Sequence, residues 1–175
     1  MMRNLILSFV FSLLALTAAL AGPQYIDSTG YAVSGYDVVS YFDLKQTAVG
    51  TPQASPAIGK AEFTATYNDA KFAFSTAANL KRFQESPASF APLYDGHCAF
   101  GVAKGGKVPG NPNLWRIVDG KLYLNIKQTV VDQWEADIPG FIKLSQGNWP
   151  GIQDKAASKS KIPDFMSTAP TKLGS

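Results

Sequence analysis

The dipeptide Asp119-Gly120 constrains the fold of this chain more than any other short segment. It separates two apolar runs of strand character, Trp115 to Val118 and Leu122 to Leu124. Asp-Gly between such runs is among the strongest signals for a tight β-hairpin, because both turn residues tolerate positive φ. A second hairpin is predicted where Asn68-Asp69 separates residues 62–67 from residues 71–74.

Short helices are predicted around the two hairpins. Their expected ranges are 38–42 after an N-capping Asp37, 77–86 after an N-capping Thr76, 87–93, 128–138, and a last helix that follows Pro139-Gly140 and ends near Pro150. No internal repeat is detected in the sequence. The predicted architecture is a small single-domain α+β fold, in which two β-hairpins form an antiparallel sheet packed by several short helices.

The first 21 residues have the three parts of a secretory signal peptide. Arg3 supplies the positive charge, and an uncharged apolar run extends from Leu5 to Leu20. Ala19 and Ala21 are the small residues that a signal peptidase requires before its cleavage site. The apolar run has 16 residues, whereas a helix that spans a bilayer needs about 20. We therefore expect cleavage after Ala21, a periplasmic or secreted location, and no membrane span in the mature chain.

The mature chain is expected to be one soluble domain. Removal of residues 1–21 leaves 154 residues, with 15 Lys and Arg against 13 Asp and Glu. A chain of this size can bury a hydrophobic core. Its nearly balanced charge, without a basic cluster, argues against nucleic acid as a partner. We assign residues 22–150 to the domain and residues 151–175, which are rich in Lys, Ser and Pro, to a disordered tail.

Cys98 is the only cysteine and its neighbour His97 is the only histidine, so no internal disulfide can form. Exported domains usually carry paired cysteines or none. Adjacent side chains point to opposite sides of a strand and lie about 100° apart on a helix. A catalytic Cys–His pair is therefore not expected, and Cys98 is predicted to be a buried structural thiol, a metal ligand or a reactive thiol.

Metal ligation tolerates adjacent ligands better than catalysis does. A thiolate and an imidazole suit copper or zinc, and zinc needs further ligands. Asp37, Asp95 and Met166 are the candidates to complete such a site.

Several longer motifs follow one another in a recognisable order. They are GYDVVSYF at residues 35–42, the segment 63–105 that contains HCAFG, WRIVDGKLYLN at residues 115–125, and NWP at residues 148–150. In this order they resemble the exported branch of the YHS-domain family, and the similarity covers about residues 32–150.

The better understood YHS and related TRASH domains handle metal ions, which the resemblance implies as a function. Their core contains two cysteines in the frame F-C-S-x-x-C, and here Ser75 and Asn79 stand at the two cysteine positions. A hydroxyl and an amide do not replace thiolates toward soft metals, so that thiolate site is absent here. The exported branch has a different recurring cysteine, in the motif (Y/H)-C-A-(Y/F), which here is Cys98 within His97 to Phe100.

The sequence and the resemblance together favour an exported, non-enzymatic binding module. Its expected ligand is a metal ion, copper or zinc, bound through Cys98 and His97, with Asp37 as a further candidate ligand. The alternatives are a thiol-redox protein that uses Cys98, and a domain that binds another envelope protein while Cys98 is structural.

Overall fold

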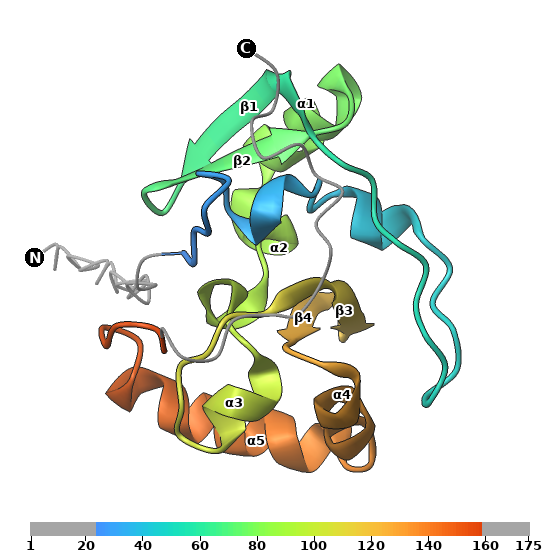
Figure 1. Cartoon of the computed structure of the whole chain (residues 1–175). Helices are drawn as coiled ribbons and strands as arrows, with labels where there is room; N and C mark the ends of the chain where they lie inside the picture. Colours follow the sequence, from blue (N-terminus) through green and yellow to red (C-terminus); the bar gives the residue numbers. More distant parts are fainter. Residues whose placement is uncertain (1–23, 159–175) are drawn as a thin grey trace, which may run out of the picture.

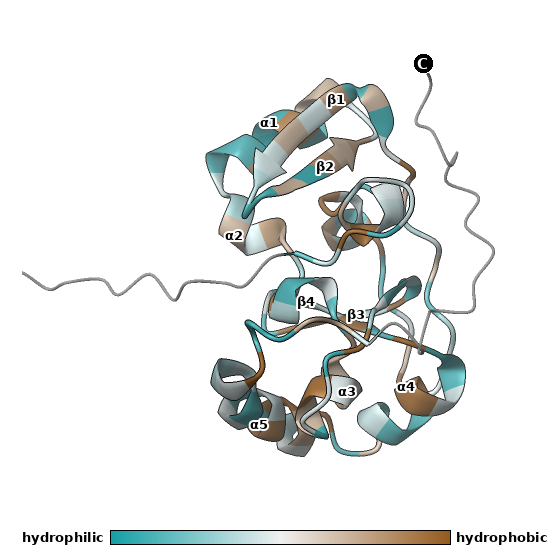
Figure 2. Ribbon diagram, turned by 60° about the vertical axis from the view of Figure 1, so that its left-hand side comes forward, coloured by the Kyte–Doolittle hydropathy of each residue, from teal (hydrophilic) through white to brown (hydrophobic). Residues whose placement is uncertain are grey.

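A computed structural model describes residues 24–158 of the chain. The elements in chain order are η1 (Val33–Gly35), η2 (Ser40–Asp43), β1 (Lys60–Tyr67), β2 (Ala70–Phe74), α1 (Ala77–Glu85), α2 (Pro87–Phe90), η3 (Leu93–Gly96), α3 (Ala99–Ala103), β3 (Asn111–Val118), β4 (Lys121–Asn125), α4 (Gln128–Glu135), α5 (Ile138–Asn148) and η4 (Trp149–Gly151), where η marks a 3₁₀ turn. Figure 1 shows β1, β2, α1 and α2 in one half of the molecule and β3, β4, α3, α4 and α5 in the other. Figure 2 shows the same division from another side. Within residues 24–158, no helix has both the length and the apolar character needed to cross a membrane.

The predicted α+β class and both predicted hairpins are confirmed. β1 pairs with β2 and β3 with β4, each in antiparallel fashion. Asn68 and Asp69 have φ values of 47° and 58°, and Asp119 and Gly120 have 48° and 68°. Positive φ at both central residues defines the twisted turn that favours a hairpin. The described strands form two separate two-stranded sheets, so the two hairpins do not pair with each other in a common sheet.

The second hairpin lies between two hydrophobic clusters. Leu122 and Leu124 pack in the first cluster, with Phe72 and the side chains of the first hairpin. Tyr123 lies between these leucines in sequence and packs in the second cluster, with Trp134. Successive side chains of a strand point to opposite faces, so β4 contributes to both clusters and joins the halves of the molecule.

The helix boundaries follow local capping signals. Thr76 Oγ1 accepts a hydrogen bond from Asn79 N at 3.1 Å, as the sequence predicts for the start of α1. The helix predicted over 128–138 ends earlier, because Asp137 caps α5 by accepting from Gly140 N at 3.0 Å. Pro139 then occupies the first turn of α5, where a missing N–H costs nothing. The break between α4 and α5 therefore lies a few residues before Pro139-Gly140, where the sequence predicts it.

The fold continues past residue 150, where the sequence predicts that the domain ends. Ile152 is buried in the second hydrophobic cluster. Ser158 N donates to Lys107 O at 2.7 Å. Residues 151–158 therefore belong to the folded part of the chain. The predicted signal peptide and residues 159–175 of the predicted tail lie outside the described residues.

The two halves of the molecule are structural repeats of each other, although no repeat is apparent in the sequence. The register of β3 and β4 copies that of β1 and β2 at a displacement of 51 positions, including an irregularity after the first pair, Lys60↔Phe74 in one and Asn111↔Asn125 in the other. α1 and α4 begin at the same displacement, after Thr76 and Lys127. We call residues 33–90 the first repeat and residues 94–141 the second repeat.

The turns that precede the hairpins also correspond. Val33, Ser34 and Gly35 have φ values of 52°, 54° and 78°, and residues 94–96 have 56°, 53° and 78°. After each turn the chain pairs with the segment before the hairpin. Asp37 N donates to Ala57 O at 2.9 Å, and Cys98 N donates to Val108 O at 2.9 Å. Asp37 and Cys98 are therefore equivalent positions, and so are Tyr36 and His97.

A glycine is required at one equivalent position of both repeats. A Cβ at Gly59 would lie 2.5 Å from Ala73 Cβ, and a Cβ at Gly110 would lie 2.7 Å from Leu124 Cβ. Gly59 and Gly110 form one of only two identical pairs when residues 57–90 are compared with residues 108–141; the other pair is Phe90 and Phe141. The repeat is thus held in backbone geometry and burial pattern rather than in residue identity.

Candidate functional site

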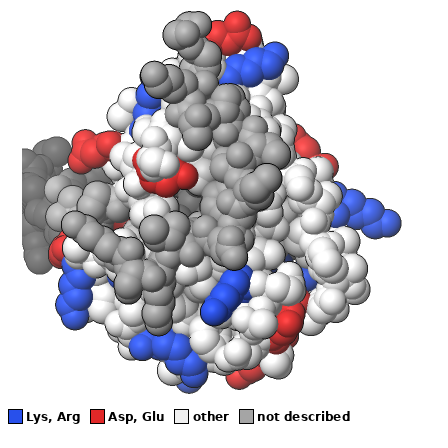
Figure 3. All heavy atoms as spheres, viewed as in Figure 1, with Lys and Arg blue, Asp and Glu red and all other residues white. Residues whose placement is uncertain are grey.

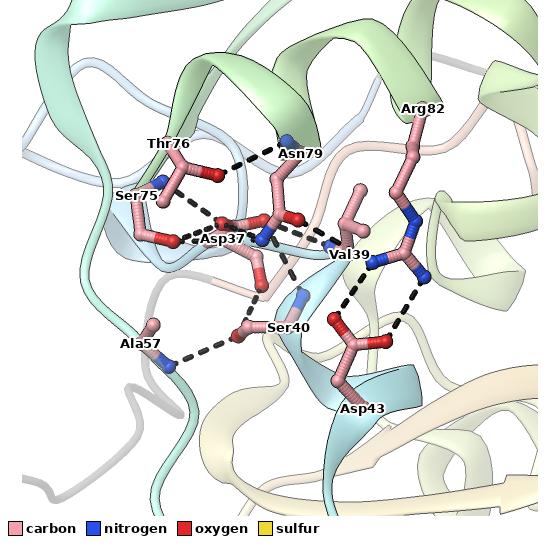
Figure 4. A network of polar contacts seen from close by, with 9 residues as sticks. All are labelled: Asp37, Val39, Ser40, Asp43, Ala57, Ser75, Thr76, Asn79 and Arg82. Atoms are coloured by element: carbon pink, nitrogen blue, oxygen red, sulfur yellow. Dashed lines mark hydrogen bonds and ion pairs between the residues drawn. The ribbon is translucent and has the colours of Figure 1, made fainter.

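Asp37 is fully buried. Figure 4 shows its carboxylate joining the turn at residues 37–40 to residues 75–79. Its Oδ1 accepts hydrogen bonds from Val39 N at 3.0 Å and Ser40 N at 3.4 Å. Its Oδ2 accepts from Ser75 N at 2.8 Å, Ser75 Oγ at 2.6 Å and Asn79 Nδ2 at 2.7 Å. An ionised carboxylate offers about four acceptor sites, so donors of the chain itself satisfy this one completely.

Ser75 and Asn79 are the two residues that the sequence resemblance aligns with cysteines. The structure brings them together with Asp37, and not Asp37 with Cys98 and His97 as the sequence analysis expected. Every contact to the carboxylate comes from an N–H or O–H group, which leaves no lone pair directed at an ion. The arrangement fixes the start of α1 against the turn before η2.

Cys98 occupies in the second repeat the position that Asp37 occupies in the first. Its Sγ accepts from Gly101 N at 3.4 Å and caps α3, as Asp37 accepts from Ser40 N three residues further along. The thiol donates to Asn125 Oδ1 at 3.4 Å. Cys98 is 1% exposed, and burial raises the pKa of its thiol, while backbone hydrogen bonds from residues such as Gly101 act in the opposite direction. Cys98 therefore caps α3 and bonds to Asn125 from a buried position.

His97 and Cys98 are both extended, with ψ values of 158° and 118°, so their side chains diverge. The His97 ring lies between Tyr25, at 5.7 Å between ring centroids, and Trp149, at 6.1 Å. Its Nδ1 lies 2.8 Å from Tyr94 O, an acceptor, so Nδ1 carries the proton. Within residues 24–158, no hydrogen bond joins Nε2 to another group, which leaves this nitrogen as an unused acceptor.

Burial keeps the imidazole neutral. It lowers the pKa of His97 to about 4, while the hydrogen bond to the Tyr94 carbonyl acts in the opposite direction and the charge of Lys107 lowers the pKa further. Lys107 Nζ donates to Gln153 O and lies 5.4 Å from the centroid of the Trp149 ring. At neutral pH the ring therefore presents a lone pair and no charge.

Asp95 is buried beside the same group of residues. Its Oδ1 accepts from Gln24 Nε2 at 3.0 Å, and its backbone oxygen accepts from Tyr25 N at 2.7 Å. Asp95 Oδ2 and Gln24 Oε1 are buried acceptors without a hydrogen-bond partner in the described part of the chain. Burial raises the pKa of Asp95 to about 6, against the effect of the Lys107 charge, which lowers it. We call Gln24, Tyr25, Asp95, His97, Lys107 and Trp149 the His97 cluster.

The fold itself does not require Asp95 and His97. The equivalent turn of the first repeat has the same backbone conformation with Ser34 and Tyr36 at these positions. A carboxyl group and an imidazole, each with an unused acceptor and a pKa shifted by burial, are more typical of a functional site than of a turn that an uncharged pair can form. The His97 cluster is therefore the candidate site.

The residues proposed as metal ligands do not gather at one point. Residues 24–158 contain no group of three or more His, Cys, Asp or Glu side chains arranged to hold a metal ion. Met166 lies outside the described residues. On the face shown in Figure 3, basic and acidic side chains are scattered among uncharged ones.

The sequence singles out Asp95, His97 and Cys98, but nothing in it points to Gln24, Lys107 and Trp149 as their neighbours. Gln24 and Asp95 lie 71 positions apart, and no local pattern connects residues at such a separation. Comparison with known proteins gave no match to a family model, to a curated protein or to a solved structure.

Proposed function

We propose that this chain is an exported, non-enzymatic binding module of the YHS type, and that it binds a metal ion, copper or zinc, through His97. The single observation that carries the proposal is the unused Nε2 of His97. The fold does not need an imidazole at this position, since Tyr36 stands at the equivalent position of the first repeat. Export and membership of the YHS family rest on the sequence.

The hydrogen bonding of the ring supports metal ligation. Imidazoles that bind metal ions are neutral and donate the other ring N–H to a carbonyl or a carboxylate, which fixes the tautomer and the ring orientation. His97 has this arrangement, with Tyr94 O as the acceptor. Tyr25 and Trp149 both pack against the ring, which restricts its reorientation on binding. A copper or zinc ion needs more than one donor, and Met166 is the further soft donor in the sequence.

The same structure favours a supporting role for Cys98. A thiol must lose its proton to bind a metal ion or to act as a nucleophile, and burial opposes that ionisation. This argues against the thiol-redox alternative. Binding to another envelope protein stays a prediction.

The proposal is tested by equilibrium dialysis of the mature protein against Zn(II), and against Cu(I) under reducing conditions, followed by metal analysis. We expect micromolar or tighter retention that His97→Asn abolishes and Cys98→Ser leaves intact. Asn is the matched replacement, because its amide keeps a donor near Tyr94 O. Loss of binding in Cys98→Ser with retention in His97→Asn, or no retention by the unaltered protein, would overturn it.

A further inference from the structure

Two acceptors of the His97 cluster point to a site for a primary ammonium group. Asp95 Oδ2 and Gln24 Oε1 are buried and without hydrogen-bond partners in residues 24–158, and both residues are more than nine-tenths buried. Gln24 already donates its Nε2 to the other carboxylate oxygen, Asp95 Oδ1, at 3.0 Å. What is missing on this side of the cluster is a hydrogen-bond donor with positive charge, and an ammonium group has three N–H donors.

The cation nearest in the cluster does not fill this role. No ion pair joins Lys107 to Asp95 in the described chain, where Lys107 Nζ instead donates to Gln153 O and lies against the Trp149 ring. A buried carboxylate that lacks a counter-ion is costly.

The position of these acceptors along the chain indicates the occupant. The predicted cleavage site after Ala21 makes Gly22 the first residue of the mature protein. Two peptide units separate the nitrogen of Gly22 from that of Gln24, a distance of at most about 7 Å. Gln24 Nε2 donates to Asp95 Oδ1 at 3.0 Å, and Tyr25 N donates to the backbone oxygen of Asp95 at 2.7 Å. A new amino terminus is therefore formed within reach of the unpartnered carboxylate oxygen.

We infer that Asp95 and Gln24 form a binding site for the α-ammonium group of Gly22, which export creates and which locks the amino terminus of the mature protein onto η3. Signal peptidase adds water across the Ala21–Gly22 amide. The hydroxyl goes to the Ala21 carbonyl carbon, the hydrogen goes to the Gly22 nitrogen, and that nitrogen then takes up a proton. Before cleavage the same nitrogen is an uncharged amide, so the contact can form only in the processed chain. The inference rests on the predicted cleavage and not on metal binding.

The test compares the mature protein that starts at Gly22 with the same protein acetylated at its α-amino group. Acetylation removes the charge and two of the three N–H groups, adds one acetyl group, and leaves the rest of the protein unchanged. We expect it to lower Tm at neutral pH by roughly 4 °C or more, the scale of a lost charge-assisted hydrogen bond in a domain of this size. The same comparison in Asp95→Asn should show almost no effect of acetylation. The decrease in Tm on acetylation should persist in the control variant Asp27→Asn, which alters another carboxylate near the amino terminus.

A second measurement keeps the test decisive if Asp95→Asn does not fold. The rate at which an amine-acylating reagent modifies the α-amino group is compared with the rate for a free Gly-Pro-Gln peptide. The paired terminus should react about tenfold or more slowly, as expected if its pKa rises by one unit. Equal rates in protein and peptide, equal Tm values with and without acetylation, or an effect of acetylation that persists in Asp95→Asn would each overturn the inference. None of these readouts involves a metal ion.

Discussion

The side-chain amide of Asn79 donates to Oδ2 of Asp37 at 2.7 Å, and this contact joins the start of α1 to a turn 42 residues earlier in the chain. Both residues belong to the first repeat, and the equivalent positions in the second repeat hold Val130 and Cys98. The contact therefore belongs to one repeat only. Cys98 therefore lacks the side-chain contact from the helix start that Asp37 receives.

Replacing Asp37 with Ala should destabilise the protein by about 3–5 kcal/mol, because it leaves several buried donors without an acceptor. The measurement is chemical denaturation at neutral pH. Asp43→Ala is the control, because Asp43 pairs with Arg82 at 2.7 Å on the surface, with side-chain exposures of 52% and 40%. Such exposed pairs contribute at most about 1 kcal/mol. Similar losses in the two variants would contradict the role assigned to Asp37.

Equivalent glycines should give equivalent losses if the two halves are repeats. Gly59→Ala and Gly110→Ala each place a methyl group in contact with the paired strand, and overpacking of this kind costs about 1–3 kcal/mol. Gly147→Ala in α5 is the control, since a Cβ there meets nothing within 4 Å. It should be neutral or stabilise the protein by up to about 1 kcal/mol. A tolerated substitution at either Gly59 or Gly110 would count against the repeat.

The Cys98 thiol should react with an alkylating reagent only when the protein opens. Its burial and raised pKa both suppress the thiolate in the folded state. The rate of modification should rise with denaturant in step with unfolding and should not change with added metal ion. Rapid labelling of the folded protein would instead support a reactive or metal-binding thiol.

The neutral state of His97 predicts a loss of stability in acid. The unfolded imidazole takes up a proton below its ordinary pKa of 6.5, whereas the folded one does so only near pH 4. Its contribution is therefore fully present above pH 6.5 and is lost as the pH falls to 4, by up to about 3 kcal/mol. The measurement is the difference in unfolding free energy between the unaltered protein and His97→Asn as a function of pH. A difference that stays constant over this range would contradict the burial of a neutral ring.

Local signals allowed the sequence to predict much of the fold. Asn68-Asp69 and Asp119-Gly120 located both hairpins, because turn chemistry acts over a few residues. Thr76 located the start of α1 for the same reason. α3 was not predicted, since its cap is a cysteine sulfur and its residues are small. The predicted break before α5 was misplaced because the sequence alone did not identify Asp137 as the cap of α5.

The repeat and most of the candidate site could not be predicted. Two identical pairs in a 34-residue comparison leave no detectable sequence signal, although backbone register and caps repeat closely. The side-chain partners of Asp37 and Asp95 in other segments lie 38 to 71 positions away, and only the folded chain brings them together. The sequence did single out His97, because it is the only histidine, but placed it with Cys98, from which its side chain diverges.

The most direct test of the central claim is X-ray absorption spectroscopy of the mature protein loaded with one equivalent of Zn(II). Nitrogen and oxygen ligands lie about 2.0–2.2 Å from zinc, and thiolate sulfur lies at about 2.3 Å. We predict a nitrogen and oxygen shell that includes imidazole scattering, no contribution from a thiolate, and loss of the imidazole signal in His97→Asn. A thiolate shell that disappears in Cys98→Ser, or a protein that retains no zinc, would contradict the account.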